Sequence, residues 1–131
     1  MGATIITPLT ALQQYFSSNK PSVQVEYAQG CFVMNASDAL INEAVGLAKS
    51  SDLALIFVGD NQDTCQESWG GRTGDRADLD LPGGQLMLID AIISTGTPVV
   101  VILINGRPAT FGVQDEVFFK LNDLFMYRIN C

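Results

Sequence analysis

The sequence predicts an α/β fold in which a mostly parallel sheet lies between two layers of helices, a three-layer αβα sandwich. Residues 53–58 and 99–104 form unbroken apolar runs, the composition expected of strands buried in a parallel sheet. Segments in which apolar residues recur at helical spacing precede and separate these runs. Helices that alternate with strands through short connections favour crossover connections and parallel pairing.

The first half of the chain contains two predicted helices and one predicted strand. Thr7 is a suitable helix cap and Pro8 suits the first helical position, and helical spacing then continues to about residue 17. Apolar residues alternate over residues 23–30, which predicts a strand that ends near a glycine. Ser37 and Asp38 open a second helix with an apolar face that extends to residue 48.

The second half repeats this alternation. Residues 53–58 are the first buried strand, and Pro82 and the glycine after it start a helix that Gly96 is well placed to end. Residues 99–104 form the next buried strand, and residues 105–108, Asn-Gly-Arg-Pro, turn the chain at its carboxyl end.

Both ends of the chain depart from a complete α/β domain. A short helix is expected over residues 115–121 and a strand over residues 124–129, after which no helix covers that strand. The chain opens with a predicted helix, so we expect the first strand of a doubly wound sheet to be missing from it. We therefore expect residues 1–131 to form a single partial α/β sandwich domain.

Composition excludes several classes of function. The chain has a formal net charge of −7, which disfavours a nucleic-acid partner because such proteins cluster Lys and Arg on one face. No apolar run approaches the roughly 20 residues that cross a bilayer, so we expect no membrane partner. The start of the chain has no basic segment followed by an apolar block, so no secretory leader is expected in it. An extracellular or periplasmic location of a longer parent stays open.

An acidic stretch, defined here as residues 59–85, follows the first buried strand. It contains six acids and two arginines. Ligands of open α/β sheets bind just beyond the carboxyl ends of the strands, so the chemistry is expected here. Glu67 is the candidate for a working carboxyl group. The acids are Asp60, Asp63, Glu67, Asp75, Asp78 and Asp80.

Three segments together resemble a known family. GDNQDTCQES, GDRADLDLPGGQLMLIDAI and GTPVVVILINGRPATF closely resemble the carboxyl-terminal α/β sandwich domain of glycoside hydrolase family 3, a flavodoxin-like domain of β-glucosidases and β-xylosidases. The resemblance covers roughly residues 5 to 121. It implies a parent enzyme in which a (β/α)8 barrel, absent from this chain, supplies an aspartate nucleophile and this domain supplies the general acid/base.

The resemblance implies retaining hydrolysis of terminal non-reducing β-linked sugars, in oligosaccharides or aryl glycosides, without a cofactor. Glu67 is the implied general acid/base, because residues 64–68, TCQES, match the family pattern TCGEG at threonine, cysteine and glutamate. Gln66 and Ser68 stand where that pattern has glycines, and the position of the donor varies within the family, so Asp63 is the second choice. The isolated chain is expected to be inactive because the nucleophile lies in the barrel.

Other residues of the stretch have two interpretations each. Trp69 either stacks on a sugar ring or packs against the barrel. Asp75 and Arg76 form an adjacent pair that is better interpreted as a loop anchor held by charge-assisted hydrogen bonds. A non-catalytic flavodoxin-like module that binds a sugar or a protein is the alternative function, and it predicts saccharide affinity without turnover.

The cysteines give no metal motif. There are three, widely spaced, and the chain has no histidine, so no metal site is expected. Cys31 and Cys65 each follow a predicted strand and could form a disulfide, although two unpaired thiols are the more common outcome. Residues 35–37 form a glycosylation sequon, but Ser37 is better interpreted as the cap of the second helix.

Overall fold

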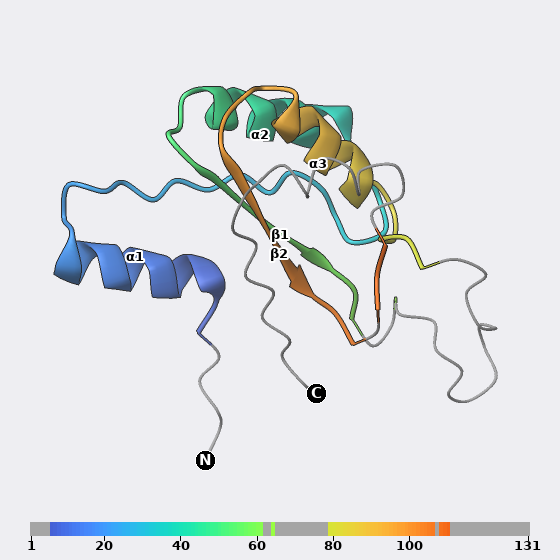
Figure 1. The fold of residues 1–131 in the computed structure, drawn as a ribbon, viewed down its shortest axis with the longest axis horizontal. Helices are drawn as coiled ribbons and strands as arrows, with labels where there is room; N and C mark the ends of the chain where they lie inside the picture. The colour runs from blue at the N-terminus through green and yellow to red at the C-terminus, as the bar shows by residue number, and fades with distance from the viewer. Residues whose placement is uncertain (1–5, 62–63, 65–78, 107, 111–131) are drawn as a thin grey trace, which may run out of the picture.

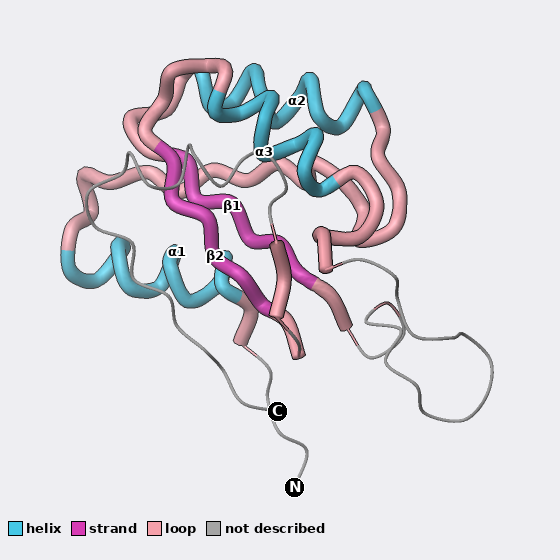
Figure 2. Tube along the Cα trace, turned by 45° about the vertical axis from the view of Figure 1, so that its right-hand side comes forward, coloured by secondary structure: helices cyan, strands magenta, loops and turns pink. Residues whose placement is uncertain are grey.

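The computed structural model describes residues 6–61, 64, 79–106 and 108–110. These residues contain two parallel strands between a pair of helices on one side and a single helix on the other (Figure 1). Figure 2 shows the same three layers from a second direction. The arrangement confirms the predicted α/β class. The expected helix over 115–121 and strand over 124–129 lie outside the described residues.

Helix α1 spans Pro8–Asn19, two residues longer than expected at its carboxyl end. The side chain of Thr7 accepts a hydrogen bond of 3.2 Å from the amide of Thr10, and Pro8 occupies the first turn, where a missing N–H leaves nothing unpaired. None of its residues is buried. The helix therefore forms where the local signals predict it, without contributing to the core.

Helix α2 spans Asp38–Lys49 and begins after Ser37, as the sequence predicts. The backbone of Ser37 is extended, as at a helix cap, but its side chain makes no capping hydrogen bond. The carboxylate of Asp38 in the first turn and the ammonium of Lys49 in the last turn complement the helix dipole instead.

The predicted strand over residues 23–30 is wrong. These residues form an extended connection from α1 towards α2, with no strand assigned (Figure 1). Within the described part of the chain the sheet is β1 paired with β2, and the connection is not part of it. Alternation of apolar residues indicates an extended backbone, whereas a strand also needs a hydrogen-bonding neighbour.

The sheet consists, in the described residues, of β1 (Ala54–Gly59) and β2 (Val99–Ile104), paired in parallel from Ala54 with Val99 to Gly59 with Ile104. Helix α3 (Gln85–Ile93) connects them and completes a βαβ unit. The sequence predicts that this helix starts near Pro82, but α3 begins three residues later, at Gln85. The amide of Gly96, which has φ of +80°, donates to the carbonyl of Ile93 and completes the turn after the helix.

The core lies between the sheet and the α2–α3 pair. Helices α2 and α3 contact each other, and α3 contacts β1. Ile89 in α3 is fully buried, with 0% of its surface exposed. The buried apolar residues are Ile41, Ala48, Ile56, Val58, Leu81, Leu88, Ile89, Ile92 and Val99.

Strand β1 is buried on one face, whereas the sequence predicts burial on both faces. Ile56 and Val58 are buried against the helix pair, whereas Leu55 and Phe57 on the opposite face are 39% and 41% exposed. Side chains alternate between the two faces of a strand, so Leu55 and Phe57 point to the face opposite the helix pair. Helix α1 does not cover that face closely, because none of its own residues is buried. The expectation of a strand buried on both faces was therefore wrong.

Ile89→Ala is expected to lower the free energy of unfolding by about 2–5 kcal/mol, because a fully buried isoleucine leaves a cavity in a packed core. Urea unfolding followed by circular dichroism measures the loss. Ile6→Ala is the matched control, since Ile6 is exposed and its truncation should change stability by less than about 0.5 kcal/mol. Equal losses for the two variants would contradict the placement of the core.

Candidate functional site

The candidate site begins where β1 ends. Gly59 is the last residue of β1 and Asp60 the first beyond it, at the carboxyl edge of the parallel sheet. Most of the acidic stretch lies outside the described residues, and the roles assigned to its members stay predictions. The predicted site residues in that part are Asp63, Cys65, Glu67, Trp69, Asp75 and Arg76.

Asp60 joins the end of β1 to the turn after β2. Its Oδ1 accepts a hydrogen bond of 3.2 Å from the amide of Gly106, and its own amide donates to the carbonyl of Ile104 at 3.2 Å. The first bond joins Asp60, one residue beyond β1, to Gly106, two residues beyond β2, and the second joins Asp60 to the last residue of β2. The carboxylate of Asp60 therefore has a structural role.

Thr64 closes a small turn with Asn61. The amide of Asn61 donates to the hydroxyl oxygen of Thr64 at 2.9 Å, and the amide of Thr64 donates to Oδ1 of Asn61 at 3.0 Å. Thr64 is buried, which is unusual for a loop hydroxyl and consistent with these reciprocal bonds. The first residue of the TCQES segment is thus anchored to the residues that directly follow β1.

Asp80 anchors the far end of the acidic stretch. The hydroxyl of Thr110 donates to its Oδ1 at 2.6 Å, and the amide of Thr110 donates to the carbonyl of Leu79 at 2.8 Å. Asp80 and Thr110 form an isolated parallel bridge. Two of the six acids, Asp60 and Asp80, therefore hold segments of the fold together.

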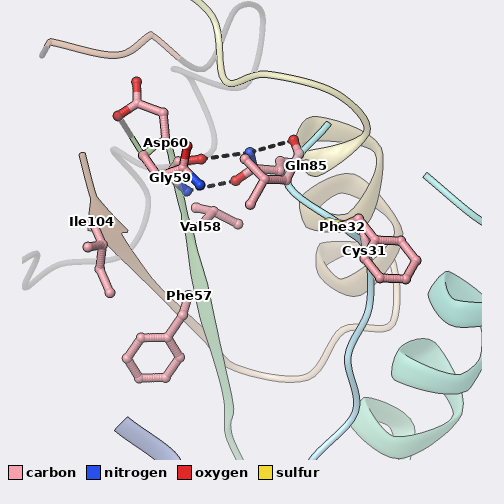
Figure 3. A pocket seen from close by; sticks show the side chains of 10 residues that line it. Cys31, Phe32, Phe57, Val58, Gly59, Asp60, Gln85 and Ile104 are labelled. Atoms are coloured by element: carbon pink, nitrogen blue, oxygen red, sulfur yellow. Dashed lines mark hydrogen bonds between the residues drawn. The ribbon is translucent and has the colours of Figure 1, made fainter. Parts of the chain in front are cut away.

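Gln85 occupies a central place that was not assigned from the sequence. It is the first residue of α3, only 2% exposed, and its side chain reaches the backbone of Gly59 (Figure 3). Its Oε1 accepts from the Gly59 amide at 2.7 Å and its Nε2 donates to the Gly59 carbonyl at 2.8 Å. The signal available in the sequence was the glutamine of the LPGGQ segment, a polar residue directly before the apolar run of residues 86–89.

Two glycines before Gln85 let another segment approach. Gly83 has φ of +65°, and a Cβ there would lie 2.5 Å from the carbonyl carbon of Met34. A Cβ on Gly84 would collide with the side chain of Ala36. Glycine is required where the backbone adopts a left-handed conformation or another chain segment approaches closely. The LPGGQ segment thus brings residues 33–36 against the amino end of α3.

A small open cleft of about 220 Å³ lies beside these contacts. Its walls come from the connection before α2, the carboxyl half of β1 and the two residues after it, the last residue of β2 and the first residue of α3. In Figure 3 the carboxylate of Asp60 points away from the side chain of Gln85. Most of the side chains that line the cleft are apolar. The lining includes Cys31, Phe32, Phe57, Val58, Gly59 and Gln85.

Cys31 is a half-buried free thiol in this structure. Burial raises its pKa above the ordinary value because the thiolate would lose solvation. Its predicted disulfide partner lies outside the described residues, and the disulfide stays a prediction. The described part of the chain holds no group of three or more His, Cys, Asp or Glu that suits a metal ion. None of its helices is long and apolar enough to span a bilayer.

Comparison with family models decides the family. The model described as the glycosyl hydrolase family 3 C-terminal domain matches residues 1–117. The chain belongs to this family. The resemblance inferred from the three sequence segments is thereby confirmed, and so is the α/β sandwich architecture expected from it.

Relatives of this family 3 chain include glycosidases from several organisms. A β-xylosidase of Formosa agariphila is 48% identical over 94 residues, which are 72% of this chain and 12% of that protein. Thermostable β-glucosidase B of Acetivibrio thermocellus is 32% identical over 122 residues, 88% of this chain and 15% of that protein. The chain thus spans less than a fifth of the length of either relative.

A solved structure supports the same assignment. A β-glucosidase from Erythrobacter marinus superposes with a TM-score of 0.69 at 33% sequence identity, covering 82% of this chain and 17% of that one. The similarity in fold therefore extends over most of this family 3 chain.

Proposed function

We propose that this chain is the C-terminal domain of a retaining β-glycosidase that hydrolyses terminal non-reducing β-linked sugars. The observation that carries the proposal is the family 3 match over residues 1–117, which includes the acidic stretch that begins at Gly59, the last residue of β1. The names of the relatives, β-xylosidase and β-glucosidase, support the substrate class. The full-length parent, as used below, is the polypeptide that joins this chain to a (β/α)8 barrel.

Two carboxyl groups perform the proposed reaction. A barrel aspartate attacks the anomeric carbon, while a carboxylic acid of this chain donates a proton to the departing oxygen. The resulting glycosyl ester is then hydrolysed by water, and the same carboxylate of this chain acts as the base. Retaining enzymes hold the two carboxyl groups about 5–5.5 Å apart, so the two domains must meet at the carboxyl edge of β1.

Glu67 is the proposed acid/base and Asp63 the second candidate. Both follow Gly59 closely in sequence, by eight and four residues. The donor must be protonated before the first step, so its pKa has to lie above the usual carboxyl range. Partial burial against the barrel and the like charges of the same stretch would both raise that pKa.

Three further features complete the proposal. Trp69 presents an apolar ring to the sugar or to the barrel. Asp75 and Arg76 anchor the loop through charge-assisted hydrogen bonds. Cys31 and Cys65 would pair if the parent enters an oxidising compartment.

The test is hydrolysis of nitrophenyl β-xyloside and β-glucoside by the full-length parent, with the anomeric configuration of the first-formed sugar followed by proton NMR. The proposal expects release of nitrophenol and a β-configured product. Inverted product would exclude the retaining mechanism. Saccharide binding measured by calorimetry without any turnover would instead favour a non-catalytic binding module.

The isolated 131-residue chain is expected to release no nitrophenol from either glycoside, because the proposed nucleophile belongs to the barrel. The assay uses purified chain at the molar concentration at which the full-length parent gives a clear rate. Turnover by the chain alone, sensitive to Glu67→Ala, would show that the barrel is not needed for hydrolysis.

A further inference from the structure

The side chain of Gln85 joins three segments that are far apart in sequence. Besides the two bonds to Gly59, its Nε2 lies 3.0 Å from the carbonyl oxygen of Pro82 and 3.2 Å from that of Val33. One buried amide therefore connects the carboxyl end of β1, the turn before α3 and the connection before α2. Figure 3 shows its bonds to Gly59.

The contacts require an amide. Oε1 faces an N–H donor and Nε2 faces three carbonyl oxygens, so a single orientation of the side chain fits. An amide nitrogen carries two protons, which the three carbonyls share. A glutamate carboxylate would place an acceptor against the same three carbonyls, and an apolar side chain would remove the partners of the half-buried N–H and C=O groups of Gly59.

Gly59 is held from two sides. Its register partner in β2 is Ile104, and the next amide, that of Asp60, donates to the Ile104 carbonyl. Gly59 itself has one backbone donor and one backbone acceptor, and the side-chain amide of Gln85 bonds to both. The point at which the chain leaves the sheet is thereby fixed in relation to both β2 and α3.

We propose that Gln85 is a positioning residue for proton donation: by holding both backbone groups of Gly59, it sets where the acidic stretch leaves the sheet and hence where the acid/base stands. This inference rests on the proposed glycosidase function. Gln85 touches no substrate in this role and acts through Gly59. Displacement of a reacting group by about 1 Å can cost roughly 10²-fold in rate, so a small shift at the origin of the stretch has a measurable effect.

The test compares substrates that differ in their need for a proton. In the full-length parent carrying Gln85→Glu, kcat/KM for phenyl β-glycoside is expected to fall about 10²-fold. The value for 2,4-dinitrophenyl β-glycoside is expected to fall much less, because that leaving group departs without protonation. Gln13→Glu, an identical change at an exposed position of α1, should leave both values unchanged.

The activity of the Gln85→Glu variant is also expected to depend on pH. A protonated glutamic acid has one O–H donor and one carbonyl acceptor, and so reproduces the two bonds to Gly59. Burial among carbonyl oxygens raises the pKa of that carboxyl group. Activity of Gln85→Glu on phenyl β-glycoside, taken relative to the unchanged parent at each pH, is therefore expected to recover as the pH falls.

Each other outcome is decisive. Equal losses on both substrates would mean that Gln85 supports only the fold, and would overturn the positioning role. A parent that hydrolyses neither glycoside refutes the proposed function instead. If circular dichroism shows Gln85→Glu to be unfolded, Gln85→Met, which keeps the volume and removes the polar contacts, replaces it. Failure of both variants to fold would also overturn the proposal.

Discussion

Glu67→Ala in the full-length parent is expected to lower kcat/KM for phenyl β-glycoside by about 10²–10⁴-fold, the usual contribution of a positioned general acid. The rate of phenol release at limiting substrate gives kcat/KM, and the rate at saturating substrate gives kcat. Addition of azide should restore turnover of activated substrates, because azide attacks the glycosyl ester without needing a general base. The restored product would be a β-glycosyl azide.

Two comparisons make this result specific. Glu43→Ala removes an exposed glutamate of α2 and should leave turnover unchanged. Asp63→Ala tests the second candidate: if its loss is the larger one and azide rescues it, the acid/base role passes from Glu67 to Asp63. Unchanged turnover in both variants would exclude both carboxyl groups as the acid/base.

Gly59→Ala is expected to destabilise the fold by about 3 kcal/mol or more. Gly59 has φ of +153°, and a Cβ there would collide with the backbone carbonyl oxygen of Ile104, the residue with which it pairs in β2. Backbone strain and overpacking each cost about 1–3 kcal/mol, and a strand backbone cannot move aside as a flexible side chain can. Thermal and urea unfolding measure the loss.

Gly46→Ala is the matched control for this substitution. Gly46 lies inside α2, and a Cβ there would meet no atom within 4 Å. Alanine should therefore stabilise the chain by about 0.5–1 kcal/mol through its higher helix propensity. Two variants that shift stability by the same amount in the same direction would contradict the close approach of β1 and β2 at Gly59.

The elements that the sequence predicts well are those with strong local signals. The Thr7-Pro8 pair and the apolar spacing after it predict α1, and the unbroken apolar run over residues 99–104 predicts β2 without error. In both cases the decisive information lies within one or two turns of helix or within the strand itself. Such signals need no knowledge of distant residues.

The mispredicted features depend on contacts between distant segments. Residues 23–30 have the alternation of a strand, but their placement depends on whether a neighbour pairs with them. The start of α3 is displaced because Gly83 and Gly84 serve the approach of residues 33–36 before the helix can begin. Gln85 was overlooked because its partners Gly59 and Val33 lie 26 and 52 residues away.

The parallel pairing of β1 with β2 also has a kinetic consequence. Ala54 meets Val99, 45 residues later in the chain, so the sheet cannot start to form until a long loop has closed. Loop closure costs entropy before any strand contact repays it, and proteins rich in such contacts fold slowly. We therefore expect α1 and α2 to appear early during refolding and the sheet to set the overall rate, with dilute protein giving the highest yield because apolar strands stay unpaired in the meantime.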